Sequence, residues 1–145
     1  MMFWIVWARL APMPYESDRA PTFRVPDGAV RLVAALDSTP LEGRLSHVTY
    51  AHERIDVDLI YPSRTPEPRL VRDALNVYDA VFRRTEAEEL WLRVLERHAG
   101  GDIVRLAIVV PRPKRLPRIP DGPLDRRALE GLLGPEAEIT WGADS

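Results

Sequence analysis

Two aspartates, Asp56 and Asp58, have the residue type and spacing that come nearest to a chemical site. They lie one residue apart in RIDVDLIYPSR, where apolar residues alternate from Ile55 to Tyr61 as in a strand. Side chains two apart on a strand point to the same face, roughly 7 Å from each other. Two such carboxylates could hold magnesium, with water and a substrate phosphate completing the oxygen shell. The pair is a candidate metal and catalytic site; the alternative is the wet face of a sheet.

The sequence around this pair resembles the metal-binding strand of the nucleotidyltransferase superfamily, in which two aspartates alternate with hydrophobic residues. In that family a Gly-Ser dipeptide precedes the aspartates, and a later strand supplies a third acidic residue. Here Ser46 stands ten residues before Asp56, but Leu45 replaces the glycine, and Glu138 in AEITW is the nearest match to the third acid. The resemblance implies a metal-dependent phosphoryl- or nucleotidyl-transfer enzyme using Asp56 and Asp58, with magnesium as its cofactor. No cofactor is expected otherwise.

A basic, proline-rich loop at residues 111–120 is the candidate partner-binding site. Its sequence, PRPKRLPRIP, has no acidic residue and carries the cations Arg112, Lys114, Arg115 and Arg118. The prolines favour an extended, polyproline-like path. Such an arm could bind an acidic protein surface or a nucleic-acid backbone, and the alternative is a solvated connection. We expect a protein partner, because the chain as a whole is acidic and would oppose a polyanion. The loop also lacks aromatic residues that stack on bases, which disfavours single-stranded nucleic acid.

Other catalytic chemistries lack their motifs. The absence of cysteine excludes disulfides, thiolate nucleophiles and cysteine-ligated zinc. The histidines at positions 47, 52 and 98 show neither His-x-Glu nor His-Glu-x-x-His spacing, so a zinc site is not expected. No serine lies in a Gly-x-Ser-x-Gly elbow, and no glycine-rich phosphate loop occurs.

Composition limits the class of protein. A chain of 145 residues that is 46% hydrophobic has the size of one domain, residues 1–145, with one core. Twenty basic against 22 acidic residues disfavour a globally basic nucleic-acid binder. Lys114 is the only lysine, and this arginine-rich composition with 14 prolines favours a bacterial, GC-rich origin. The apolar N-terminal run is too short to span a membrane, so we expect a cytoplasmic protein.

The first half of the chain must supply the strands that position the aspartates. Residues 3–7, FWIVW, predict a strand buried on both faces. An irregular, proline-rich segment at 11–27 follows. Residues 29–36 fit either a helix or an alternating strand, and Ala-Ala-Leu favours the helix. Alternation in 43–50 and 55–61 predicts two strands of a hairpin.

The second half is expected to be largely helical. Thr65 and Pro66 predict the start of a helix whose apolar stripe runs from Leu70 to Phe82. We expect a strand at 102–111, a third helix at 123–133 and a final strand in AEITW.

Residues 85–99 predict a further helix. Thr85 and Glu88 form the pattern of a capping box, and Gly100 would end the helix. Trp91 would then lie in the buried stripe, and His98 would interact with the C-terminus of the helix in its last turn.

These elements predict an α+β domain of two layers. We expect a single small mixed or antiparallel sheet of about five strands, with two to three helices packed on it. The leading function is a non-catalytic interaction or regulatory module, an accessory subunit of a larger assembly, with a homo-oligomer possible. The alternatives are the metal-dependent enzyme and a nucleic-acid-associated accessory protein using residues 112–118.

Overall fold

The computed structural model describes residues 4–6 and 27–142. Of the expected irregular segment 11–27, only Asp27 lies among the described residues. Six strands form one sheet: β1 (Trp4–Val6), β2 (Arg44–Ala51), β3 (Arg54–Tyr61), β4 (Glu89–His98), β5 (Gly101–Pro111) and β6 (Glu138–Trp141). The described helices are α2 (Asp27–Ser38), α3 (Glu67–Arg84) and α4 (Arg126–Leu133). The helix favoured over residues 29–36 is therefore confirmed as part of α2.

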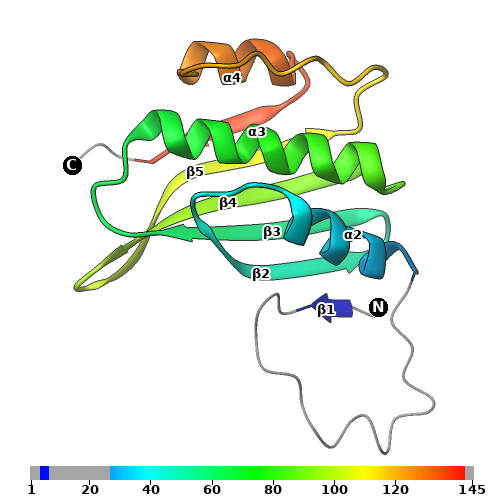
Figure 1. Ribbon diagram of the computed structural model, residues 1–145, viewed down its shortest axis with the longest axis horizontal. Coiled ribbons are helices and arrows are strands. Elements are labelled where there is room, and N and C mark those ends of the chain that lie inside the picture. Colours follow the sequence, from blue (N-terminus) through cyan, green and yellow to red (C-terminus); the bar gives the residue numbers. More distant parts are fainter. Residues whose placement is uncertain (1–3, 7–26, 143–145) are drawn as a thin grey trace, which may run out of the picture.

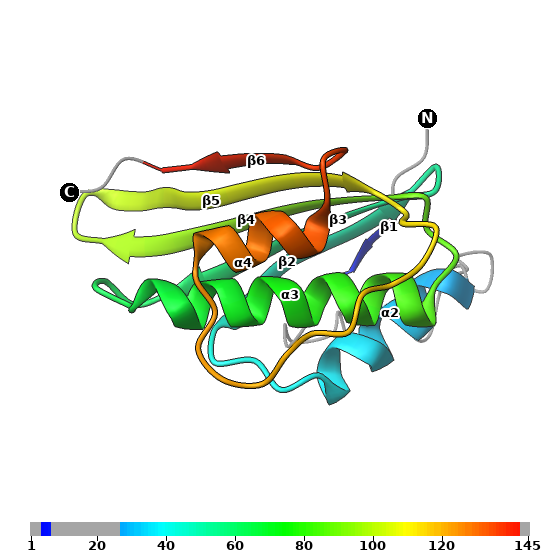
Figure 2. The same cartoon turned by 90° about the horizontal axis from the view of Figure 1, so that it is seen from above.

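The sheet is mixed, and its strands lie in the order of the chain. Neighbouring strands are antiparallel except β3 and β4, which are parallel and are joined through α3. The three helices lie on the same face of the sheet (Figure 1). Seen from above, the helices form one layer and the strands the other (Figure 2). The predicted two-layer α+β fold is confirmed.

The core fills the space between the sheet and the helices. Alternate residues of the central strands, such as Val57, Leu92 and Ile108, are buried against apolar side chains of α3, such as Leu75 and Val81. Burial of this kind contributes about 1.5–3 kcal/mol for each large aliphatic side chain. No helix in the described part of the chain is long and apolar enough to cross a membrane.

The helix predicted over residues 85–99 is wrong, because residues 89–98 form strand β4. Leu90, Leu92 and Val94 are buried in alternation, whereas Trp91 has 40% of its surface exposed. Apolar residues at these positions satisfy both the helical and the strand period. Parallel pairing with β3 and antiparallel pairing with β5 decide between the two. The predicted positions of Trp91 in a buried helical stripe and of His98 in a last helical turn are wrong with it.

Thr85 ends a helix and does not begin one. Its hydroxyl donates a hydrogen bond to the Val81 carbonyl at 2.7 Å, at the C-terminus of α3, and accepts one from the Ala87 amide at 3.2 Å. The two residues Ala99 and Gly100 form the turn between β4 and β5, where Gly101 has a φ of +124°. A single residue can therefore satisfy a sequence pattern for either end of a helix.

The start of α3 also differs from expectation. Pro66, which has no polar side-chain group, occupies the N-cap position. The Thr65 hydroxyl does not cap the helix and donates to the Pro62 carbonyl at 2.7 Å. Helix α4 begins at Arg126, three residues after the predicted Pro123, where the Asp125 side chain accepts from the Ala128 amide.

The strand predictions hold, with local differences. The turn of the β2–β3 hairpin lies at His52 and Glu53, which both have positive φ. Strand β1 confirms a strand in FWIVW, but the expected burial of its side chains lies outside the described part. Strand β5 is flanked by β4 and β6, although Ile103 and Val104 are exposed.

A buried carboxylate joins the start of β2 to α3. Oδ2 of Asp73, which is 1% exposed, accepts hydrogen bonds from the Tyr61 hydroxyl and from the Glu42 and Gly43 amides, both at 2.9 Å. Burial raises the pKa of Asp73, and its three hydrogen bonds oppose that shift. A Cβ on Gly43 would lie 2.4 Å from the Tyr61 ring, so the cluster requires a glycine there.

Candidate protein interface

The face of the sheet opposite the helices arranges side chains in rows across the strands. One row consists of Thr49, Asp56, Trp91, Val109 and Glu138. The next row consists of His47, Asp58, Arg93, Ala107 and Thr140. A third row consists of the exposed Arg44 at one end and the apolar residues Ile60, Leu95 and Val104. We call these three rows the open face.

Trp91 is the most prominent aromatic residue of the open face, and two neighbours fix its orientation. Its indole Nε1 donates a hydrogen bond to Glu89 Oε1 at 2.7 Å. The Arg54 guanidinium lies 4.2 Å from the centre of the indole ring, within cation–π range. Arg54 also pairs with Asp56, whose Oδ1 lies 2.9 Å from Arg54 Nε. An exposed tryptophan is thus held in one place by charged groups on two strands.

Asp58 and Arg93 form a bidentate ion pair between β3 and β4. Arg93 Nε and Nη2 donate to the two carboxylate oxygens at 2.9 and 2.6 Å. The hydrogen bond with Asp58 raises the pKa of the Arg93 guanidinium. The carboxylate is largely covered, with 12% of its side chain exposed, whereas the guanidinium is 56% exposed. The outward charge at this point is therefore positive.

His47 and Thr49 extend the polar part of the open face onto β2. The Thr49 hydroxyl and His47 Nε2 are 3.1 Å apart, and His47 lies opposite Asp58 in the strand register. Thr49 is buried although it faces away from the helices.

Asp56 and Asp58 lie on one face of the sheet, as their spacing predicts. Each carboxylate forms an ion pair with an arginine, Asp56 with Arg54 and Asp58 with Arg93. Glu138 lies in the same row as Asp56 but three strands away, roughly 14 Å at the usual spacing. Ser46 occupies a bulge in β2. Among the residues that the structure describes, no three histidine, aspartate or glutamate side chains gather as a metal ligand set would.

The basic loop is divided between a structural and an exposed part. Arg112 donates hydrogen bonds to the carbonyls of Phe82, Thr85 and Ala87, where α3 ends and the chain turns into β4. Lys114 and Arg115 are exposed, and Arg118 lines a groove beside α3. The loop passes across α3 to reach α4 (Figure 2). Three of the four predicted partner-binding cations are therefore outward, and Arg112 is not.

Comparison with protein-family models, with curated proteins and with solved structures finds no match for this chain.

Sequence reasoning missed Trp91, Arg54 and Arg93 as residues of a surface site. The signal that could have found them is the alternation of apolar and polar residues in ELWLRV, which places Trp91 and Arg93 opposite Leu90 and Leu92.

Proposed function

We propose that this protein is a non-catalytic protein-binding module, an accessory or regulatory subunit whose open face binds an apolar and acidic surface of a partner protein. The observation that carries the proposal is the exposed Trp91, held by Glu89 and Arg54 on a face that none of the described helices covers. Tryptophan and arginine are the residues most enriched at energetic hot spots of protein interfaces. Their fixed orientation reduces the entropy that binding would otherwise cost.

The charge of the expected partner follows from which groups lie outermost. At the Asp58–Arg93 pair the carboxylate is covered and the guanidinium is exposed. At the rim, Arg97 has 66% of its side chain exposed, against 41% for its partner Asp102. An approaching surface meets the arginines first, so acidic groups on the partner complement it.

The size and composition of the open face suit an interface of standard type. Strands β2 to β5 have 8 to 11 residues each and β6 has 4, so these strands together cover roughly 24 by 26 Å. That area approaches the about 800 Å² per partner of a typical complex. The apolar residues Ile60, Leu95 and Val104 and the neighbouring polar rows give a mixture of apolar and charged side chains such as interfaces contain.

The two other functions receive less support from the same geometry. A metal at Asp56 and Asp58 would have to displace Arg54 and Arg93 from their ion pairs. A nucleic-acid backbone at the basic loop would have no access to Arg112, because its guanidinium is engaged by three carbonyls.

Site-specific photocrosslinking tests the proposal in the native cell. A benzoylphenylalanine in place of Val104 samples the open face, and the same residue in place of Arg69, which is exposed on α3, samples the helical layer. We expect a defined partner from position 104 and none from position 69. Equal yields from both positions would contradict an interface on the open face. If position 104 crosslinks only to a second copy of this chain, the open face is a dimer interface and the proposed partner protein is wrong.

Titration of the purified partner then measures the contribution of the anchor. Trp91→Ala should weaken the affinity at least about 30-fold, because a hot-spot residue contributes 2 kcal/mol or more. Arg69→Ala serves as the control and should leave the affinity unchanged. If Trp91→Ala binds as tightly as the wild type, the open face is not the binding surface.

A further inference from the structure

Strand β6 ends the sheet, and it has no strand neighbour besides β5 among the described residues. The Gly142 amide donates to the Arg105 carbonyl at 2.9 Å, and in an antiparallel ladder such pairs recur at every second residue. Thr140 and Glu138 therefore pair with β5. Ile139 and Trp141 direct their backbone N–H and C=O groups to the outer edge, where another strand could add.

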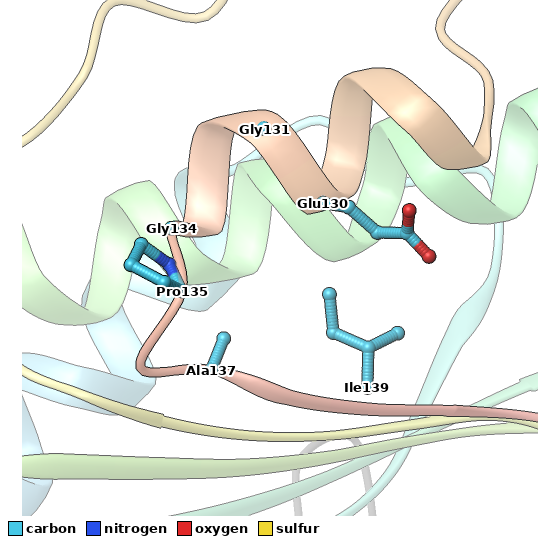
Figure 3. A pocket seen from close by; sticks show the side chains of 6 residues that line it. All are labelled: Glu130, Gly131, Gly134, Pro135, Ala137 and Ile139. Atoms are coloured by element: carbon cyan, nitrogen blue, oxygen red, sulfur yellow. The ribbon is translucent and has the colours of Figure 1, made fainter.

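A groove lies directly beside this edge, between the end of α4 and β6. Its volume is about 400 Å³, and it is lined by Glu130, Gly131, Gly134, Pro135, Ala137 and Ile139. Figure 3 shows the side chains of Ala137 and Ile139 rising from the strand toward the helix, with the Glu130 carboxylate at one side. A Cβ added to Gly131 or to Gly134 would meet no atom within 4 Å, so these positions are open space.

The two sides of the edge differ in character. Ile139 shares the helical face of the sheet with the groove, whereas Glu138 belongs to the open face in register with Val109. Glu136 and Glu138 are both exposed. Since side chains of an added strand alternate between the two faces, its apolar residues would enter the groove and the residues between them would meet carboxylates.

Charge also distinguishes between possible occupants. A second copy of this chain, pairing β6 with β6, would bring the segment EAEITW, which has no basic residue to pair with Glu136 and Glu138. An extended segment bearing lysine or arginine at alternate positions complements them.

We propose that the β6 edge and the adjoining groove bind an extended peptide segment in which apolar and basic residues alternate, by strand addition. The backbone groups of Ile139 and Trp141 supply the hydrogen bonds, the groove accepts the apolar side chains, and Glu138 meets the basic ones. This surface shares Glu138 with the open face but uses none of Trp91, Arg54 and Arg93, so it does not rest on the function proposed above.

Fluorescence anisotropy with defined peptides tests the proposal on the full chain. The probe is a labelled, acetylated octapeptide of alternating valine and lysine, and the matched control replaces each lysine with glutamate. We expect saturable binding of the lysine peptide and at least tenfold weaker binding of the glutamate peptide. Equal binding of the two, or no binding of the lysine peptide at 1 mM, would overturn the proposal.

Two further comparisons identify the binding mode. Gly131 lines the groove, and a Cβ there would meet no atom within 4 Å, so Gly131→Leu should project into the groove. Because it also replaces a helical glycine, it should keep the melting temperature and weaken binding of the lysine peptide at least tenfold. N-methylation of the peptide at one set of alternate residues should abolish binding, and at the other set should not. If Gly131→Leu binds the lysine peptide as tightly as the wild type, or if the two methylations change the affinity equally, strand addition is refuted.

Reversal of charge and measurement of mass complete the test. The double variant Glu136→Lys, Glu138→Lys should prefer the glutamate peptide. If the protein is a dimer by sedimentation equilibrium, and Gly131→Leu makes it monomeric while no peptide binds, the occupant is a second copy and the peptide proposal is wrong.

Discussion

At the scale of single residues, stability depends on buried polar groups whose hydrogen-bonding partners come from distant parts of the chain. Asp73 and Glu96 are both buried, and each accepts hydrogen bonds from donors on other elements. A buried acceptor with several donors is costly to remove, because the donors then remain without partners in a low-dielectric interior.

Asp73→Ala should lower the free energy of unfolding by about 3 kcal/mol or more. The change leaves the Tyr61 hydroxyl and two backbone amides unpaired beside the core. Asp79→Ala is the matched control on the same helix, because the ion-pair partner of Asp79 among the described residues is the exposed Arg83, and it should cost less than about 0.5 kcal/mol. Urea denaturation measures both; equal losses would show that the Asp73 cluster contributes nothing specific.

Glu96 makes the stability depend on pH. Burial opposes its ionisation, but the hydrogen bond from His98 and the charge of Arg105 outweigh burial and lower the pKa. A carboxyl whose pKa is lower in the folded than in the unfolded state stabilises the fold fully above its ordinary value of 4.5, and this contribution declines as the pH falls below that value.

Glu96→Gln should therefore reduce the stability at pH 7 and flatten its decline below pH 4.5. Thermal melts between pH 2.5 and 7 measure the difference between the two proteins. We expect that difference to be largest at neutral pH and to shrink toward acid. A constant difference over the whole range would mean that ionisation of Glu96 does not stabilise the fold.

At the scale of secondary-structure elements, β4 separates the two faces of the molecule. Its even-numbered residues from Leu90 to Val94 enter the core, and Trp91 and Arg93 belong to the open face. Truncation of a core residue of β4 should therefore cost much more stability than truncation of its neighbour on the open face.

Leu92→Ala should cost about 2–5 kcal/mol because it leaves a cavity in the core. Trp91→Ala should cost less than about 1 kcal/mol, since it removes a partly exposed ring and one cation–π contact. Chemical denaturation of the two variants measures the contrast. A larger loss for Trp91→Ala than for Leu92→Ala would place Trp91 in the core and remove the open face as a surface.

At the scale of the whole molecule, the basic loop at residues 111–120 links the sheet to the helical layer. It leaves β5, crosses α3 and reaches α4 (Figure 2), and Arg72 on α3 donates to the carbonyls of Pro120 and Gly122. Arg112 attaches its beginning to the end of α3 and also lies 5.1 Å from the Phe82 ring. The loop thus combines a fixed start with exposed cations.

Arg112→Gln should destabilise the protein by about 2–3 kcal/mol, because charged hydrogen bonds to three carbonyls are lost. Lys114→Gln is the control two residues along the same loop, and its stability should stay within about 0.5 kcal/mol of the wild type, as for a solvated side chain. Guanidinium denaturation compares them. If Arg112→Gln is as stable as the wild type, this arginine is available to a partner.

Much of the fold could be predicted from local patterns. The apolar stripe of α3 repeats at helical spacing from Leu70 to Phe82, about three and a half turns, and this pattern predicts a helix with one buried face. The alternation in β3 is as strict, so Asp56 and Asp58 were correctly placed on one face. The apolar residues are even-numbered up to Tyr50 and odd-numbered from Ile55, and this change predicts the hairpin turn between them.

Tertiary structure alone decided the rest. Residues 89–98 satisfy both periods locally, and only the edges offered by β3 and β5 make them a strand. The partner of Asp58 is Arg93, 35 residues away, and the parallel register of β3 and β4 brings them together. The sequence alone therefore determined which residues alternate between faces. Which residues meet across those faces depended on strand pairing, because pairing joins segments distant in the chain and leaves no local pattern.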